Sequence, residues 1–406
     1  MFRRGENTRI FGFAHSVAIA ALIGGFVVGG TQGLVVVALL GVLEIAVSFD
    51  NAIVNATILA RMNHYWQRLF MTVGVLIAAI GMRLLLPLII VAIGAHLTPW
   101  RAVDLAYADP NRYHELLLTA QPGIAAFGGI FLLMIAIAFF REEREVHWWP
   151  AVEKRLPALL GRTGVPILIA LLFTAVAGLT VPSDDRTRVV VGCVVGLACY
   201  LGIHLLSEQV ADRADADGAS RPRATVQGRS AFLLFVYLEL LDATFSMDSV
   251  MGGFSVTVDI ALITLGLAIG AGYIRALTVY VVRKGTLEEY RYLEHGAYYS
   301  IAMLAVLLLW EVWRDVPDWI TACTGAVVIT AAWLTSIWAA KRQARDEELR
   351  EIGIGGERAT VQRFTGGPQA GSTAAASDAN SGADEDEVHD HELDQTAYPN
   401  HPPVAS

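Results

Sequence analysis

The stretch Glu44-Ile45-Ala46-Val47-Ser48-Phe49-Asp50-Asn51-Ala52 sets two carboxylates, a hydroxyl and an amide inside an apolar run from about Leu34 to Ala60. A water-soluble core does not explain such a group. A second stretch, Glu239 to Ser249, repeats the order of residues: an acid at 242, then serine, aspartate and a small polar residue four, six and seven positions later. The two stretches therefore predict two halves of one polar site buried among apolar helices.

The composition indicates a membrane protein. Of the 406 residues, 54% are hydrophobic and 17% are charged, whereas soluble domains have roughly a quarter charged residues. The net charge of -9 arises partly in the tail, where residues 384–394 hold seven acids and no Lys or Arg. The three cysteines lie in apolar segments without the spacing of a zinc site or a disulfide framework; they are Cys193, Cys199 and Cys323.

About 20 apolar residues are needed to cross a bilayer, and about ten segments meet that requirement. The predicted fold is therefore an all-α polytopic membrane protein with about ten transmembrane helices. The expected spans are 11–30, 33–60, 68–96, 122–140, 163–182, 188–207, 230–252, 258–283, 296–313 and 317–340.

The positive charges predict the orientation, because Lys and Arg accumulate in short cytoplasmic loops. With the N-terminus inside, the inner loops hold 17 Lys and Arg before the tail and the outer loops hold five. An odd number of spans would scramble this bias. We therefore expect a multi-pass protein of the cell membrane with both termini in the cytoplasm.

A second pattern shows that the halves of the chain are repeats. Thr72-Val73-Gly74 is followed by Arg83, and Thr264-Leu265-Gly266 by Arg275, each arginine eleven residues after the threonine. The first three-helix set starts outside and the second starts inside, so the repeats are inverted. Inverted repeats with polar helices place substrate sites near the bilayer midplane of transporters.

The expected organisation follows from these assignments. It comprises 1–32, an N-terminal start and first helix; 33–140, repeat one; 141–229, a connecting region with two further helices and a polar cytoplasmic loop; 230–313, repeat two; 314–340, a last helix; and 341–406, an acidic cytoplasmic tail, expected to be disordered from about residue 356.

Helical geometry puts Glu44, Ser48, Asn51 and Asn55 on one stripe, and Asp242, Ser246 and Ser249 on another, with Glu239 one turn earlier. Asp50 and Asp248 lie about 120° from these stripes. Either the helix is unwound there or each aspartate reaches a different neighbour. Gly252-Gly253 makes unwinding easy in the second copy, and the first copy has no comparable glycine.

An intramembrane carboxylate costs roughly 2.5–3.5 kcal/mol on insertion scales and is a functional candidate. All donors are oxygens, which Mg, Ca and Mn prefer; Mn is favoured because Met247 offers one softer donor. Arg83 and Arg275 either bond loop carbonyls or pair with motif carboxylates when the metal is absent, and their equivalent positions favour pairing. The predicted metal ligands are Glu44, Asp50, Asn51, Asp242, Asp248 and Ser249, supported by Ser48, Glu239, Ser246, Arg83 and Arg275.

The motif around Asp50-Asn51, Arg83 and the run that starts at Gly128-Gly129 resemble the TerC family of integral membrane proteins, which is associated with tellurite resistance and manganese export. The resemblance covers roughly 34–140 and 231–313. It implies a relation to LysE-type exporters with inverted three-helix repeats. Asp242 and Ser249 stand where the first motif has Glu44 and Asn51, and the extra helices and long tail mark a longer, divergent branch.

The function expected from these features is transport of divalent metal ions, most simply manganese export by alternating access, with protons as a possible coupling ion. The expected partners are the lipid bilayer and the cation, with no nucleic acid and no enzymatic activity. Two alternatives are a non-transporting membrane scaffold in a metal or tellurite stress response and an intramembrane aspartyl protease. The protease lacks support because Tyr-Asp and Gly-x-Gly-Asp motifs are missing around Asp50 and Asp248.

Overall fold

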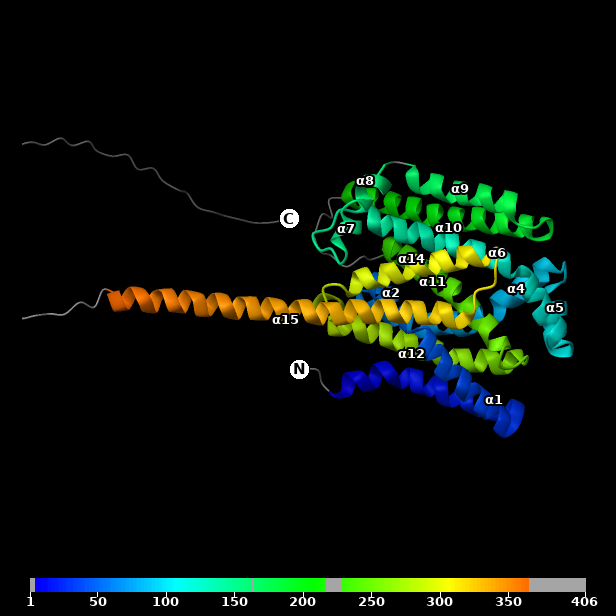
Figure 1. Cartoon of the computed structure of the whole chain (residues 1–406). Coiled ribbons are helices and arrows are strands. Elements are labelled where there is room, and N and C mark those ends of the chain that lie inside the picture. Colours follow the sequence, from blue (N-terminus) through cyan, green and yellow to red (C-terminus); the bar gives the residue numbers. More distant parts are fainter. Residues whose placement is uncertain (1–3, 163, 217–227, 365–406) are drawn as a thin grey trace, which may run out of the picture. The chain divides into compact units, whose positions relative to one another are not determined.

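The computed structural model describes residues 4–162, 164–216 and 228–364, and within these ranges every regular element is a helix (Figure 1). The chain divides into one unit, Met1–Arg345, and a second unit, Asp346–Ser406. All the predicted site residues lie in the first unit. The protein is an all-α, multi-pass membrane protein, as its composition predicts.

Every predicted span is helical over most of its length, because a backbone in an apolar environment must satisfy its own hydrogen bonds. In chain order they are α1 (Arg4–Val47), α2 (Phe49–Leu59), α3 (His64–Leu69), the π-helical segments η1 (Phe70–Gly74) and η2 (Ile77–Leu85), α4 (Leu86–Gly94), α5 (Pro99–Ala108), α6 (Pro110–Arg141), α7 (Pro150–Glu153), α8 (Leu156–Leu160), α9 (Val165–Thr180), α10 (Ser183–Ala216), α11 (Gly228–Phe254), α12 (Ile260–Lys284), α13 (Thr286–Glu289), α14 (Leu293–Glu311) and α15 (Asp318–Phe364).

By length and composition, eight helices in the described ranges could cross a membrane, or nine if the bent pair Pro150–Leu160 and Val165–Thr180 is one span. The segment Ile10–Val47 is counted once in that number. It nevertheless contains a kink at Gly30, whose φ of 61° suits glycine. The two limbs of α1 run in opposite directions along α12. In the first limb Ala14 approaches Gly272 and Gly24 approaches Leu265, so this limb is antiparallel to α12. In the second limb Leu40 approaches Gly266 and Glu44 approaches Gly270, so this limb is parallel to α12. Taken as two spans, the limbs bring the number to the expected ten.

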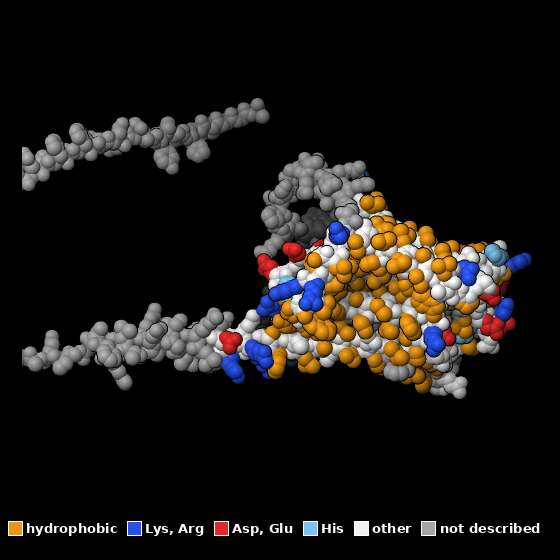
Figure 2. Space-filling model, turned by 45° about the horizontal axis from the view of Figure 1, so that its top comes forward, with side chains coloured by type: hydrophobic (Ala, Val, Ile, Leu, Met, Phe, Trp, Pro, Cys, Tyr) orange, Lys and Arg blue, Asp and Glu red, His pale blue; other side chains and the backbone are white. Residues whose placement is uncertain are grey.

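The exposed surface of the first unit matches a bilayer environment. Figure 2 shows a broad band of hydrophobic side chains, with charged side chains gathered toward the two ends of the molecule. Large apolar side chains such as Val27, Leu168, Leu179 and Ile93 are more than half exposed. In a soluble protein, patches of this extent would be unusual, so this band is the lipid-facing surface.

The two motif helices run in opposite directions. The second limb of α1, continued by α2, is parallel to α12, as the approaches of Leu40 and Glu44 show. Helix α11 precedes α12 across a short loop, and Gly253 contacts Ile263, so α11 is antiparallel to α12.

The other two pairs of corresponding helices are also antiparallel. Gly74 lies against Arg275, whereas Arg83 reaches Glu44 beside Gly270, so the η1–η2 segment runs against α12. Helices α6 and α14 are antiparallel as well, with Gln121 next to Glu311 at one end and Phe139 next to His295 at the other. The three-helix repeats are therefore inverted, as the sequence predicts.

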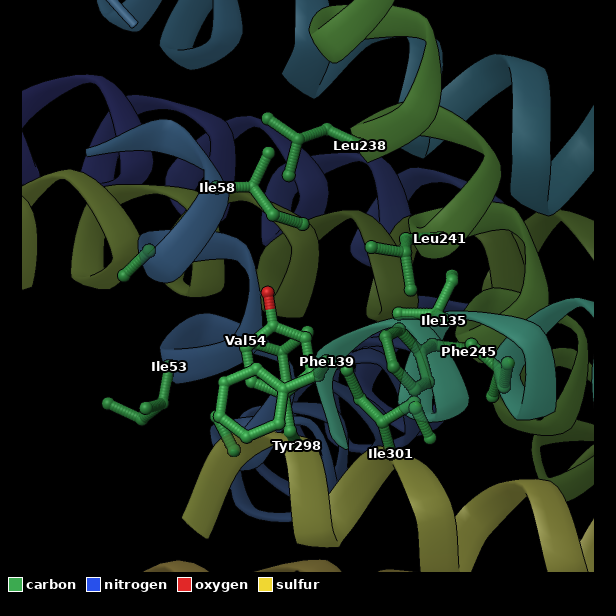
Figure 3. Packing of buried hydrophobic residues seen from close by; sticks show 14 of the residues in the cluster. Ile53, Val54, Ile58, Ile135, Phe139, Leu238, Leu241, Phe245, Tyr298 and Ile301 are labelled. Atoms are coloured by element: carbon green, nitrogen blue, oxygen red, sulfur yellow. The ribbon is translucent and has the colours of Figure 1, made fainter. Parts of the chain in front are cut away.

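The largest apolar core lies among α2, α6, α11 and α14. Figure 3 shows Val54 of α2 close to Phe139 of α6 and Tyr298 of α14, with Leu241 and Phe245 of α11 beside Ile135. The Phe139 and Tyr298 rings stack with centroids 3.8 Å apart. This cluster fills the space between the repeats at one level of the molecule.

Several boundaries differ from the sequence prediction. Helix α6 begins at Pro110, well before residue 122, because Asp109 caps its first turn and Pro122 is accommodated inside it. Helix α5 was not predicted. Helix α15 continues to Phe364, past residue 356 where order was expected to end, since its Ala, Arg, Gln and Glu residues are strong helix formers. The remaining tail, 365–406, and most of the central loop, 217–227, lie outside the described residues.

Candidate functional site

The first motif borders a cavity of about 270 Å³ in the first unit. The cavity extends from Asp50 and Ser300 toward Ser255 and Val316, which lie in the loops after α11 and α14. Its polar lining comprises Glu44, Ser48, Asp50, Asn51, Gln121, Ser249, Ser255, Ser300, Glu311, Thr321 and Thr324. Both repeats and α15 therefore contribute to one polar chamber inside the helix bundle.

Glu44 lies near the end of α1 and is buried, with 3% exposure. Its Oε1 accepts hydrogen bonds from Arg83 Nη2 at 2.6 Å and from Ser48 Oγ at 3.1 Å. The same guanidinium donates through Nη1 to the carbonyl of Ala78 at 3.1 Å. Arg83 is in the π-helical segment η2, and π-helical turns occur frequently at functional sites. The predicted pairing of this arginine with a motif carboxylate is observed.

Asp50 faces another neighbour. The helix is interrupted at Ser48, whose φ and ψ are -93° and 15°, and α2 begins at the next residue. Asp50 Oδ1 accepts from the backbone N–H of Asn51 at 3.0 Å, and Oδ2 accepts from Ser300 Oγ at 3.0 Å. Because Asp50 lies in the first turn of α2, the helix dipole also stabilises its negative charge.

Gly325 of α15 makes room for this carboxylate. A methyl group at Gly325 would overlap Asp50 Oδ2 and come within 3.0 Å of Ser300 Oγ. Both alternatives raised by the helical wheel therefore occur: the helix is interrupted, and Asp50 and Glu44 reach different neighbours. The interruption is in the first copy, whereas α11 runs unbroken through Gly252-Gly253.

The second copy forms a sealed ion-pair cluster. Arg275 donates to Glu239 Oε1 and Oε2, each at 3.0 Å, and to Asp242 Oδ2 at 3.1 Å. Its guanidinium lies 4.2 Å from the centre of the Phe70 ring, and Gly74 is close enough that a methyl group there would clash. The cluster contains two carboxylates and one cation. Neither Glu239 nor Asp242 lines the cavity.

The rest of the second motif is divided between two environments. Ser249 lines the cavity, while Ser246 is buried and its hydroxyl has no hydrogen-bonding partner among the described residues. Asp248 lies in α11, but its side chain is outside the described part of the structure. The cavity thus unites Glu44, Ser48, Asp50, Asn51 and Ser249, and leaves Asp242 with Arg275.

Six polar residues of the cavity lining were missed by sequence reasoning: Gln121, Ser255, Ser300, Glu311, Thr321 and Thr324. Ser300, Thr321 and Thr324 are small polar residues in apolar helices, which carry no distinguishing signal. Glu311 accepts a hydrogen bond from Gln121 at the wider part of the lining. A carboxylate at the end of the apolar run before Trp313 was a signal that pointed to Glu311.

A second cavity, of about 220 Å³, lies at the other end of α2. It is lined by Ile58, Arg61, Ile135, Ala138, Phe139, Glu142, Arg144, Tyr200, Ile203, His204, Leu234, Tyr237 and Tyr298. Phe245 lines the first cavity, Phe139 and Tyr298 line the second, and all three belong to the apolar cluster of Figure 3. The cluster therefore lies between the two cavities.

The lining of the first cavity suits a hard cation. Its ionisable groups near Asp50 are carboxylates, and the other donors are hydroxyls and the Asn51 amide, which bind Mg, Ca and Mn rather than softer metals. Among the described side chains, no three carboxylate, imidazole or thiol groups converge on one point. In this arrangement an ion would contact Asp50 or Glu44 together with neutral oxygens.

Comparison with known proteins identifies the family. The family described as "Protein of unknown function (DUF475)" matches residues 49–343. Since this is well over half of the 406 residues, the chain belongs to that family. Neither the curated proteins nor the solved structures contain a match. The resemblance to TerC stays a prediction.

Proposed function

We propose that this member of the DUF475 family transports divalent metal ions, most simply exporting manganese, by alternating access. The observation that carries the proposal is the cavity with Glu44 and Asp50 between inverted repeats, separated by an apolar cluster from a second cavity. Transporters with inverted repeats bind substrate where the repeats meet and expose the site to one side at a time. Access to Asp50 from one side and a barrier on the other are what this scheme requires.

The ion class is inferred from the donors. The carboxylates of Glu44 and Asp50, the Asn51 amide and the hydroxyls of Ser48 and Ser300 are all oxygen ligands. Manganese accepts such ligands and gains from one softer donor. Met247, the softer donor expected from the sequence, is buried in an apolar cluster and does not line the cavity, whereas Met251 does. Calcium and magnesium are the competing ions.

The orientation is inferred from the sequence charges. The cavity lining includes Ser255 and Val316, which lie in loops on the side opposite the Lys- and Arg-rich loops. In a plasma membrane with both termini in the cytoplasm, this side is external. The arrangement then corresponds to the outward-facing state of an exporter, after the ion has reached the outer cavity.

The two arginines supply the counter-charges of the empty transporter. Arg83 neutralises Glu44, so a cation that binds there must compete with the guanidinium for the same oxygen. A carboxylate binds either a proton or a metal cation, and a proton is therefore a suitable coupling ion. Cation binding and guanidinium displacement would be linked in one step at Glu44.

The proposal is tested by cation flux in proteoliposomes. Purified protein is reconstituted and the movement of Mn²⁺, Ca²⁺ and Mg²⁺ is followed with trapped fluorescent indicators. Asp50→Asn should abolish flux. The control Glu115→Gln, which alters an exposed ion pair with Arg112, should behave as the unaltered protein. Absence of flux of all three ions, or full flux in Asp50→Asn, would contradict the proposal.

A further inference from the structure

A buried amide on α2 has no bonding partner. Asn55 is fully buried, and neither its Oδ1 nor its Nδ2 has a hydrogen-bonding partner among the described residues. An unsatisfied buried polar group is destabilising, and each such group in a native structure calls for an explanation. A Leu at this position would fill a similar volume without that penalty. The amide therefore makes no stabilising hydrogen bond among the described residues.

Asn55 lies along α2 between residues that line the two cavities, although it lines neither itself. Asn51 lines the first cavity and Ile58 lines the second, and both belong to α2. With a rise of 1.5 Å per residue, Asn55 lies about 6 Å beyond Asn51 and about 4.5 Å before Ile58. At 3.6 residues per turn, it is rotated by about 40° from Asn51 and about 60° from Ile58. One face of α2 thus presents Asn51, Asn55 and Ile58 in succession.

The residues of α2 on either side of Asn55 belong to an apolar cluster. Val54 of α2 packs with Phe139 and Tyr298 in the cluster between the cavities (Figure 3). A cation that moves from the second cavity to Asp50 must pass a stretch with few oxygen donors. An amide carbonyl is a donor of the type that hard divalent cations accept.

We propose that Asn55 is an intermediate ligand for the cation on a path along α2 between the two cavities. The inference rests on the proposed transport function and adds to it the route of the ion and a site that the sequence motif does not include. Asn55 binds a partly dehydrated divalent cation transiently, after it leaves the second cavity and before it reaches Asn51 and Asp50. In the empty protein the amide is left without a partner.

The test compares Asn55→Leu with the control Thr278→Val. The control also removes a buried polar group, but Thr278 is in α12 and lines neither cavity. Asn55→Leu should unfold at the same or a higher temperature, because an unsatisfied amide is replaced by an apolar side chain. Its Mn²⁺ flux should fall at least about tenfold, since losing a polar partner of a charged group weakens an interaction by that factor or more. Thermal stabilisation by Mn²⁺ at Asp50 should stay unchanged, and Asn55→Ser, which keeps an oxygen, should recover part of the flux.

Each outcome separates the two proposals. Flux in Asn55→Leu equal to that of Thr278→Val overturns the role of Asn55 and leaves the transport function standing. Loss of both flux and Mn²⁺-dependent stabilisation in Asn55→Leu also overturns it, because the residue would then belong to the Asp50 site. If the unaltered protein moves no divalent cation, the proposed function fails and this inference fails with it.

Discussion

Replacing the two equivalent arginines should have unequal effects on stability, because their surroundings differ. Arg275→Gln removes three hydrogen bonds, at 3.0, 3.0 and 3.1 Å, and leaves Glu239 and Asp242 buried without a cation. Removing one partner of a buried ion pair typically costs about 3–5 kcal/mol. Here two carboxylates lose their shared partner, so the upper end of that range applies.

Arg83→Gln should be better tolerated. It leaves one carboxylate, Glu44, which retains the Ser48 hydroxyl and borders the cavity, where water can solvate it. Losing one hydrogen bond to a charged group costs about 1.5–3 kcal/mol. Arg83→Gln should therefore lower the thermal midpoint by about half as much as Arg275→Gln does in the same detergent.

Manganese should distinguish the two variants further. In Arg83→Gln a cation can take the place of the guanidinium beside Glu44, and a ligand at 100 times its dissociation constant stabilises by about 2.7 kcal/mol. Mn²⁺ should then reverse most of the decrease in thermal midpoint in Arg83→Gln and little of the decrease in Arg275→Gln. The triple variant Arg275→Gln, Glu239→Gln, Asp242→Asn should recover stability, because no unpaired charge remains. Equal losses in the two single variants, or equal rescue by Mn²⁺, would refute the assignment of Glu44 to an accessible site and of Arg275 to a sealed one.

Three further predictions concern the cavity. Gly325→Ala should reduce flux and lower the free energy of unfolding by about 1–3 kcal/mol, because the methyl group overlaps Asp50. In the control Gly81→Ala the methyl group makes only an ordinary contact with Ile77, so stability should be unchanged or higher. Flux and thermal midpoints are measured for both variants. Glu311→Gln should raise the half-saturating Mn²⁺ concentration without lowering the maximal rate, with a smaller effect at high salt, if Glu311 attracts cations to the wider part of the cavity. A proton gradient that is acid on the side opposite the manganese should accelerate its flux in proteoliposomes if protons are exchanged, and a protonophore should remove the acceleration.

The sequence predicted the helical repeats well because bilayer physics leaves strong signals. A span must be apolar and helical, so composition and periodicity locate it. The inversion followed from the order of the motifs and the distribution of Lys and Arg. The pairing of Arg83 and Arg275 with motif carboxylates was also predictable, since a charge inside a span needs a partner.

The partition of the acids between two environments was not predictable. Glu44 and Asp242 occupy equivalent positions in the motif, yet one borders a cavity and the other is sealed beneath Arg275. Ser300 and Gly325 come from α14 and α15, and a lone serine or glycine in an apolar helix carries no signal of its own. The π-helical turns at Arg83 were likewise invisible, because their cause is tertiary.

The difference between the two copies can be traced to two sequence departures. The second copy adds Glu239, which receives two hydrogen bonds from Arg275, and shortens Glu44 to its counterpart Asp242, which receives a third. In the first copy Glu44 accepts a single hydrogen bond from Arg83. A cation entering on the Glu44 side therefore competes with a single charged hydrogen bond, whereas on the Arg275 side it would have to disrupt three in a dry environment. In the proposed scheme a cation can replace Arg83 beside Glu44 in the first copy. In the second copy Arg275 stays paired with Glu239 and Asp242, and these ion pairs join α11 to α12. If the protein transports cations as we propose, binding energy at Glu44 and Asp50 would be available to move one repeat against the other.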